Sequence, residues 1–417
     1  MRNNKIYLLK DFELSTKMEA RVRAEEFKKY IAQMNEFGCK SYWVVANTGV
    51  GAQMEIDEFV GKTSAFIAND YLGMSQQPET IEAGIAALNK YGTGACAAQV
   101  IGGYLDIHHE LEQKIAEFTG QEDAILFSSG FGANTGLLRS ILGKNDIAYV
   151  DSYIHTSASS GLIGTNTKHI GHNDIEYLDM VLSKNEEGYQ TRLVIIDGVY
   201  SQNGDLSRLP EYIAVCKKHG AMLMVDDAHG IGVMGENGRG TAEHFGCLGQ
   251  ADIITGTFSK SFGCVGGFVA ASKELIQYLR YYADSNIFSA AITPQVTASV
   301  LKAMELIKAH PEIRKKLWDN VHYLRQRMKE EGFDVGESES PIFPVMVRDN
   351  KKVYEISKEK KKRGIFVSGI VYPAVRTKEA RLRVSILATH EKWQLDHLIN
   401  SLNEINEIIP FKHGARK

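Results

Sequence analysis

One lysine, Lys260, stands between a short apolar run and a group of glycines. The segment is "DIITGTFSKSFGCVGG", residues 252–267, in which Thr257, Phe258 and Ser259 precede the lysine. A lysine at the end of a buried strand loses part of its hydration, which favours the neutral amine. A neutral amine can form a Schiff base with a carbonyl carbon and can take up protons. Because most lysines are surface residues, this hypothesis depends on the residues at the ends of the neighbouring strands.

The preceding apolar run ends in "MVDDAHG", residues 224–230, which contains Asp226 and His229. A buried aspartate can keep a heteroaromatic nitrogen protonated by ion pairing. Pyridoxal phosphate (PLP) requires such a partner, because its electron-accepting power comes from the protonated ring. His229 can hydrogen-bond a phenolic oxygen on the same ring. The alternative is that Asp226 and Asp227 only cap a turn or a helix.

Two other segments supply groups that suit the same cofactor. "FSSGFGAN", residues 127–134, is typical of a strand, a glycine turn and the first turn of a helix. Free N–H groups at a helix N-terminus bind phosphate, although many turns share this pattern. "VDSYIHTSASSG", residues 150–161, offers His155, which can stack on an aromatic ring. A lone histidine is more often a structural residue, so neither segment identifies the site by itself.

The elements that position these residues alternate along the chain. Between about residues 60 and 295, apolar runs typical of buried strands alternate with amphipathic helical patterns. This alternation predicts an α/β fold with a mostly parallel sheet covered on both faces, and ligands bind at the carboxyl ends of such strands. The expected strands are "DAILFSSG", "RLVIIDGVYS", "AMLMVDDAHG", "ADIITGTFSK" and "GGFVAAS", and the expected helices are "LDIHHELEQKIAEFTG", "RLPEYIAVCKKHG" and "KELIQYLRYYA".

Three segments are predicted as domains. Residues 1–60 hold a helix and a small hairpin, residues 61–295 form the large domain with the strand ends described above, and residues 296–417 form a smaller α+β C-terminal domain. The basic run "KEKKKR", residues 358–363, is predicted to be a solvated helix end.

Composition narrows the class of protein. The 417 residues carry a formal net charge of -3, so no basic face for nucleic acid is indicated. The start "MRNNKIYLLKDFELSTK" lacks the apolar part of a signal peptide, and no stretch approaches the roughly 18 apolar residues of a membrane span. The 5 cysteines are scattered without disulfide or metal spacing, which favours a cytoplasmic protein and predicts no metal site. "GIGVMG", residues 230–235, matches a dinucleotide motif but leads into a turn, so no dinucleotide site is predicted.

Taken together, "SSGFGAN", His155, "DGVYSQNGD", "VDDAHGIGVMG" and "GTFSKSFGCVGG" resemble the α-oxoamine synthase family of fold-type I PLP enzymes. The match extends from "ANDYLGM" at residue 68 to "LRVSILATH" near residue 390. The resemblance implies a transferase with a sheet of the seven-stranded type and a homodimer with active sites at the interface.

The resemblance also implies a role for each matching residue. Catalytic roles fall to Lys260, which forms the Schiff base and moves the Cα proton, to Asp226 at the ring nitrogen, to His229 near the phenolic oxygen, and to His155, which stacks on the ring. Cofactor-binding roles fall to Ser201 near the phenolic oxygen, to Gly130, Phe131, Gly132, Thr257 and Ser259 at the phosphate, and to Ser289, which reaches the phosphate of the other subunit. Asn69 and Arg383 would bind the amino acid, Arg383 through its carboxylate.

Within the family, the chain is most similar to the serine palmitoyltransferase-like branch, and it departs from that branch in three places. Ala97, Ala98 and Gln99 stand where Gly-Ser-Arg is usual. Asn203 replaces an acid, and Ser152, Tyr153 and Ile154 stand where acids often precede the histidine. Hydroxyls come after the histidine at Thr156, Ser157, Ser159 and Ser160.

Fewer acids and more hydrogen-bond donors suit an amino acid with an anionic side chain. The resemblance then favours L-cysteate, condensed with a long-chain fatty acyl thioester to give 3-ketocapnine for sulfonolipid synthesis. The donor is acyl-CoA or acyl carrier protein, and an amphiphilic product suits peripheral membrane contact. The alternatives are L-serine giving 3-ketosphinganine, short-chain transfer such as glycine C-acetyltransferase activity, an ordinary aminotransferase, and a non-catalytic partner subunit.

Overall fold

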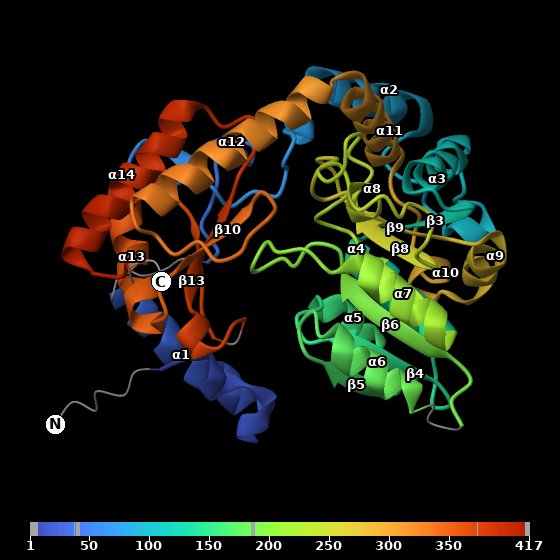
Figure 1. Ribbon diagram of the computed structural model, residues 1–417. Coiled ribbons are helices and arrows are strands. Elements are labelled where there is room, and N and C mark those ends of the chain that lie inside the picture. The colour runs from blue at the N-terminus through green and yellow to red at the C-terminus, as the bar shows by residue number, and fades with distance from the viewer. Residues whose placement is uncertain (1–6, 37, 39–41, 185–187, 373, 413–417) are drawn as a thin grey trace. The chain divides into compact units, whose positions relative to one another are not determined.

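The computed structural model of the chain describes residues 7–36, 38, 42–184, 188–372 and 374–412. The chain divides into two compact units, one formed by Asn69–Trp318 and the other by Met1–Ala68 together with Asp319–Lys417. Figure 1 labels their elements. The division falls within helix α12 (Pro311–Glu330).

The larger unit is built on a sheet of seven strands in the order β3-β9-β8-β7-β6-β4-β5. The pairs from β8 to β5 are parallel, and β9 runs antiparallel to both β3 and β8. The predicted fold, a mostly parallel sheet flanked by helices, is therefore confirmed. The strands are β3 (Asp123–Phe127), β4 (Ile147–Asp151), β5 (Asn166–Ile170), β6 (Arg192–Asp197), β7 (Met222–Asp226), β8 (Ile253–Thr257) and β9 (Gly267–Ala271).

Helices cover both faces of this sheet. Leu137 of α4, Ala158 of α5 and Ile276 of α9 belong to one buried apolar cluster with alternate strand residues such as Ile195. The intervening strand residues, such as Val194, are buried as well. The helices of this unit are α2 (Pro78–Tyr91), α3 (Asp106–Thr119), α4 (Gly130–Ile141), α5 (Thr156–Gly161), α6 (Ile175–Ser183), α7 (Leu209–His219), α8 (Thr241–His244), α9 (Lys273–Tyr282), α10 (Asp284–Ile287) and α11 (Pro294–Ala309), with 3-10 turns η3 (Met74–Gln76) and η4 (Gln99–Ile101).

The smaller unit joins the two ends of the chain. Strand β2 pairs antiparallel with β1 and parallel with β11, so the N-terminal hairpin shares a sheet with a strand some 300 residues later. The domain boundaries predicted from the sequence lie near residues 60 and 295, whereas the compact units divide at 68 and 318. The elements are β1 (Gln53–Glu55), β2 (Lys62–Ala65), β10 (Ile342–Met346), β11 (Ile365–Phe366), β12 (Ser368–Ile370), β13 (Arg381–Ser385), α1 (Ala20–Glu36), α13 (Asn350–Lys362), α14 (Lys392–Ile408), η1 (Leu9–Phe12), η2 (Leu14–Thr16) and η5 (Thr377–Glu379).

The basic run at residues 358–363 corrects one expectation. It does end a helix, α13, and Lys362 and Arg363 pair with Glu359 there. Lys360, however, is fully buried and donates a hydrogen bond to the carbonyl of Val367. Burial lowers the pKa of Lys360 to about 7. Its neighbour in sequence, Lys361, is also mostly covered, so the run is only partly solvated.

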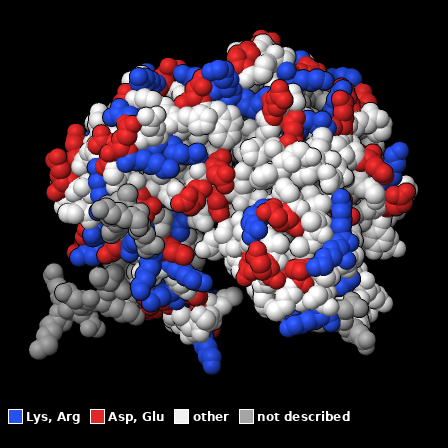
Figure 2. Space-filling view, in the orientation of Figure 1, with Lys and Arg blue, Asp and Glu red and all other residues white. Residues whose placement is uncertain are grey.

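Charges of both signs are interspersed on the face that Figure 2 shows, with no continuous basic area among the described residues there. This agrees with the net charge of -3. Within the described part of the chain, no helix is both long and apolar enough to span a membrane.

Candidate active site

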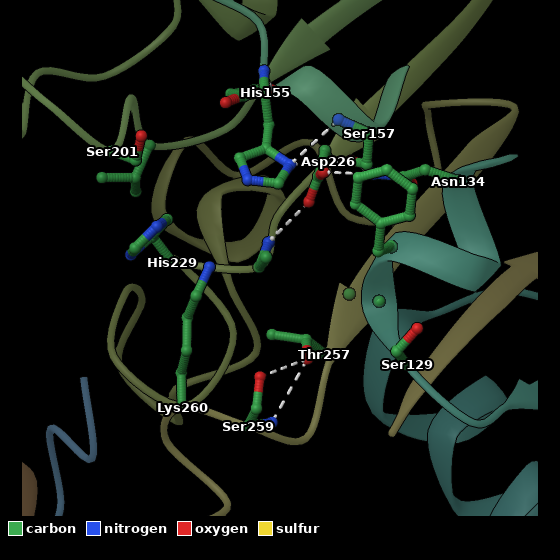
Figure 3. A pocket seen from close by; sticks show the side chains of 16 residues that line it. Ser129, Asn134, His155, Ser157, Ser201, Asp226, His229, Thr257, Ser259 and Lys260 are labelled. Atoms are coloured by element: carbon green, nitrogen blue, oxygen red, sulfur yellow. Dashed lines mark hydrogen bonds between the residues drawn. The ribbon is translucent and has the colours of Figure 1, made fainter. Parts of the chain in front are cut away.

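The candidate site lies where three neighbouring parallel strands end. Asp197 of β6 pairs in register with Asp226 of β7, and Asp226 pairs with Thr255 of β8, so the carboxyl ends of these strands lie at one edge. A cavity of about 270 Å³ opens there (Figure 3). It is lined by Ser129, Gly130, Phe131, Asn134, His155, Ser157, Asp197, Val199, Ser201, Asp226, Ala228, His229, Gly256, Thr257, Ser259 and Lys260.

Asp226 is a buried carboxylate that donors from two other positions hold in place. Asn134 Nδ2 donates to its Oδ2 at 2.6 Å, and the N–H of Ala228 donates to its Oδ1 at 3.1 Å. The residue is only 7% exposed. Asn134 is itself held, because its Nδ2 also lies 2.8 Å from Ser157 Oγ. The carboxylate is therefore fixed in orientation and can accept one further charged donor in the cavity.

His155 caps helix α5 and lines the cavity while part of the residue stays exposed. Its Nδ1 lies 2.7 Å from Ser157 Oγ and accepts from the N–H of Ser157 at 3.3 Å, while its own backbone N–H donates to Asp197 Oδ1 at 3.3 Å. Burial lowers the pKa of His155, the charge of Asp226 opposes this, and the charge of Lys260 adds to it. A neutral, oriented imidazole in the wall of the cavity suits stacking on an aromatic ring.

Lys260 and the N-terminus of α4 contribute to the same cavity. Figure 3 shows the Lys260 side chain extending into it beside His229. Ser129 caps α4 by accepting the N–H of Gly132 at 2.9 Å, and Gly130 and Phe131 line the cavity at this helix start. Thr257 Oγ1 and Ser259 Oγ, which lie 2.8 Å apart, belong to the same lining. Such a combination of helix N-terminus and hydroxyls binds phosphate.

His229 is connected to Asn69 through a buried tyrosine. Tyr71 is fully buried, and its hydroxyl lies 2.7 Å from His229 Nδ1. The same hydroxyl lies 3.3 Å from Asn69 Oδ1. Asn69 is not part of the cavity lining, but this short chain of contacts leads from it to a residue that is.

Several glycines near the cavity allow segments of the chain to pack closely against one another, rather than making space for a ligand. A Cβ on Gly267 would lie 2.5 Å from backbone atoms of Gly130, and one on Gly263 would lie 2.2 Å from the N atom of Ser75. Neither Gly263 nor Gly267 lines the cavity, whereas Gly130 and Gly256 do. Gly263 and Gly267 are thus required by close approach of one backbone segment to another.

Nine of the sequence-predicted site residues line one cavity, and four lie elsewhere. The nine are Lys260, His155, Asp226, His229, Gly130, Phe131, Ser201, Thr257 and Ser259. Gly132 comes two residues after Gly130, and its N–H donates to Ser129 Oγ. Arg383 is buried in β13 of the smaller unit, where its Nη1 donates to Ser385 Oγ at 2.9 Å. Asn69 and Ser289 are outside the lining as well.

Ser289 comes shortly after α10, which packs on the start of α4 through the hydrogen bond from Ser285 Oγ to the carbonyl of Gly132, 2.6 Å long. Asn286 of α10 donates to Gln99 Oε1 at 2.9 Å. Gln99 is one of the departures from the family pattern, and an arginine there has no acceptor atom for this bond. In this chain, the hydrogen bond from α10 to η4 (Gln99–Ile101) therefore depends on the glutamine.

Sequence reasoning missed Asn134 and Asp197. Asn134 stands one helical turn after Gly130, a spacing that puts both on the same face of α4. Asp197 ends the apolar run before "GVYS" and lies beside Asp226. Burial raises the pKa of Asp197 well above its usual range, and the charge of Asp226 adds to this. The cavity thus contains two acids in different environments.

The residues of the cavity fit PLP. The buried, doubly held Asp226 suits the ring nitrogen, Lys260 suits the aldehyde, and the start of α4 suits the phosphate. The "GIGVMG" segment is confirmed as a turn, since the next helix, α8, begins only at Thr241.

Comparison with known proteins points to the same class of enzyme. Residues 65–402 match the family described as aminotransferase class I and II. The serine palmitoyltransferase of Sphingobacterium spiritivorum is 42% identical over 339 residues, which cover 81% of this chain and 85% of that protein. The 8-amino-7-oxononanoate synthase of Thermoanaerobacter pseudethanolicus is 39% identical over 342 residues, covering 82% of this chain and 87% of that protein.

Solved structures show the same similarity in three dimensions. A serine palmitoyltransferase variant from S. paucimobilis with a bound PLP–myriocin aldimine has a TM-score of 0.87 at 31% identity, covering 92% of this chain and 98% of that chain. The serine palmitoyltransferase of Sphingomonas wittichii has a TM-score of 0.86 at 31% identity, with the same coverage.

Proposed function

This chain belongs to the aminotransferase class I and II family and, within it, is a PLP-dependent α-oxoamine synthase, and from this we propose the substrates that it joins. As an α-oxoamine synthase it condenses an amino acid with an acyl thioester. We propose that the amino acid is L-cysteate and that the donor is a long-chain fatty acyl thioester. The products are then 3-ketocapnine, CO2 and the free thiol carrier.

The roles proposed for the residues rest on their places around the cavity. PLP, when bound, supplies an electron sink that stabilises negative charge at the Cα atom of the amino acid. Asp226, held by Asn134, keeps the ring nitrogen protonated. Lys260 takes the Cα proton on Nζ and returns a proton after CO2 has left. His155, which lines the cavity, would stack on the bound cofactor and orient the carboxylate that leaves.

One observation carries the choice of L-cysteate: positions 152–154 and 203, in loops beside the cavity, hold no acids, whereas acids are usual there in the serine branch. Asn203 lies in the turn between Tyr200 and Asp205, two residues after the cavity residue Ser201. Residues 152–154 lead into His155 without a carboxylate. A sulfonate keeps its negative charge at all working pH values, so nearby carboxylates would repel it. Of the hydroxyls that come after His155, that of Ser157 belongs to a residue of the cavity lining.

L-Serine is the second candidate, favoured by the relatives. The 42% identical protein of Sphingobacterium spiritivorum is a serine palmitoyltransferase. A serine side chain needs only one hydrogen-bond partner, which Ser201 at the cavity can supply. The two substrates differ by a full negative charge, so binding distinguishes them.

The test is a titration of the purified holoenzyme with L-cysteate, L-serine, glycine and L-alanine, monitored by visible absorption of the bound PLP. We expect L-cysteate to shift the absorption at a concentration at least about tenfold lower than L-serine, which corresponds to about 1.4 kcal/mol. A tighter response to L-serine assigns the chain to serine palmitoyltransferase activity. A response to glycine alone assigns it to short-chain acyl transfer.

We also propose a homodimer with its active sites at the interface. Phe288 is 86% exposed, and Ser289 beside it is partly exposed, which suits a segment that a second copy covers. We also propose a cytoplasmic location, from the scattered cysteines, and peripheral contact with a membrane, from the amphiphilic character of the product. The donor carrier is CoA or acyl carrier protein.

A further inference from the structure

A three-residue charge cluster lies next to the cavity without lining it. His172 Nδ1 is 3.1 Å from Asp151 Oδ1, and His172 Nε2 is 2.5 Å from Asp205 Oδ2. The side chain of Asp151 is fully buried, and those of His172 and Asp205 are 21% and 18% exposed. Both ring nitrogens must donate to carboxylates in this arrangement, which requires the imidazolium form.

The two carboxylates belong to the two loops that carry cavity residues. Asp151 ends β4, and the short segment 152–154 leads from it to His155. Asp205 closes the turn that begins at Tyr200 and contains Ser201, because the N–H of Tyr200 donates to its carbonyl at 3.0 Å. His172 therefore bridges the His155 loop and the Ser201 loop, and it comes from a third segment, after β5.

Aromatic rings enclose the bridge. Tyr153, from the His155 loop, stacks on His172 with ring centroids 4.4 Å apart. Tyr200, from the Ser201 loop, meets it edge-on, also at 4.4 Å. Asp151 in addition accepts the N–H of Tyr153 at 2.8 Å and the hydroxyl of Tyr212 at 3.3 Å. Among the described residues, the titratable groups in contact with His172 or Asp151 thus include two carboxylates and three phenols, and the buried Asp197 interacts electrostatically with Asp151.

We propose that His172 is a positioning residue of the enzyme, whose bridge between Asp151 and Asp205 holds His155 over the cofactor and Ser201 beside it. The proposal rests on the PLP site described above, but not on which amino acid the enzyme uses. His172 touches neither cofactor nor substrate. It acts through the two loops, so its loss changes how the cofactor is held before it changes any chemical step.

The bridge depends on pH because it requires His172 to be protonated. Burial by itself lowers the pKa of His172, but the hydrogen bonds and charges of Asp151 and Asp205 outweigh it and raise the pKa to about 9. A raised histidine pKa stabilises the fold fully below the unfolded value of about 6.5, and this stabilisation is lost as the pH rises through about 9. In the folded protein the two loops lose this connection only as the pH rises through about 9, where His172 itself loses its proton.

The experiment compares His172→Gln with His169→Gln, an exposed histidine on β5 that serves as the matched control. Glutamine can donate to one carboxylate but cannot bridge two as a cation. We expect His172→Gln to raise the Kd for PLP by about tenfold, as for the loss of one charge-assisted hydrogen bond, and to change the visible circular dichroism of bound PLP. We expect the gap from wild type to persist at neutral pH and to narrow as the pH rises through about 9, where His172 of the folded wild-type protein loses its proton. The control, His169→Gln, should have the wild-type Kd for PLP and the wild-type visible circular dichroism.

Asp205→Asn is the second variant, because it removes the negative charge from one half of the bridge at a partly exposed position and leaves Asp151 paired. It should raise the Kd for PLP by a smaller factor, about threefold. If both variants bind PLP with the wild-type Kd and dichroism, even at a lower Tm, His172 is only structural and the proposal is wrong. If His172→Gln does not fold, Asp205→Asn decides. Both readouts are independent of the amino-acid substrate, so failure of the L-cysteate proposal leaves them unaffected.

Discussion

At the scale of residues, the chemistry depends on two acids, Asp226 and Asp197, that lie at neighbouring strand ends in different environments. Asp226 accepts two donors, from Asn134 and Ala228, and is held at the cavity by them. Asp197 accepts the N–H of His155, and burial raises its pKa well above its usual range. Asp226 is thus oriented to accept a charged donor in the cavity, whereas burial opposes the charged form of Asp197. These two different environments suit a cofactor with one protonated ring nitrogen.

Lys260→Ala is the residue-scale test of the catalytic assignment. Removing the amine takes away both the covalent link to PLP and the group that moves the Cα proton, so product formation should fall by roughly 10³-fold or more. The visible band of lysine-bound PLP should disappear from the purified protein. Lys273→Ala, an exposed lysine at the start of α9, should leave both unchanged. If Lys260→Ala forms product as fast as wild type, the catalytic role assigned to Lys260 is wrong.

At the scale of elements, the site depends on close packing between α4 and the strand that comes after Lys260. The start of α4 lies against β9, where a Cβ on Gly267 would come within 2.5 Å of Gly130. A Cβ on Gly130 would come within 2.9 Å of Thr257 Cβ. The phosphate-binding end of α4 and the strand ends are therefore positioned by glycine contacts as much as by hydrogen bonds.

Gly267→Ala should consequently disturb both the fold and the cofactor. The added methyl meets backbone atoms, which cannot move aside as a flexible side chain can, so we expect a loss of roughly 1–3 kcal/mol in unfolding free energy. Thermal denaturation with and without PLP measures this. Gly94→Ala is the control, since its Cβ would meet nothing within 4 Å and should change stability by less than about 0.5 kcal/mol. Equal Tm values for the two variants would contradict the packing argument.

Much of the element order could be predicted from the sequence, because the runs ending at Phe127, Asp197, Asp226 and Thr257 are strongly apolar and lie in separate strands of one sheet. Strands β4 and β5 were not among the predicted runs. Strand β5, "NTKHI", is polar, since it lies at the edge of the sheet. Motifs local in sequence located Lys260 and Asp226. The contact of Asn134 with Asp226 joins segments far apart in the chain, and the burial of Lys360 depends on tertiary packing, which no local pattern contains.

At the scale of the whole molecule, the chain is an α-oxoamine synthase whose cavity lies in its larger unit, Asn69–Trp318. The smaller unit contains Arg383, which is buried in β13 and hydrogen-bonded to Ser385. Its role in binding the carboxylate of the amino acid is a proposal, as is the role of Ser289 at the phosphate of a second copy. We propose that the absence of acids at positions 152–154 and 203, beside the cavity, distinguishes this enzyme from its serine-using relatives.

The most direct test of whether L-cysteate is the amino-acid substrate is a competition experiment. The holoenzyme is given L-cysteate and L-serine at equal concentrations, with palmitoyl-CoA and, separately, palmitoyl-acyl carrier protein, and the products are separated by mass. We predict that 3-ketocapnine exceeds 3-ketosphinganine by at least about tenfold with one donor or the other. An equal or larger amount of 3-ketosphinganine would contradict the choice of L-cysteate, and the absence of both products would contradict long-chain acyl transfer.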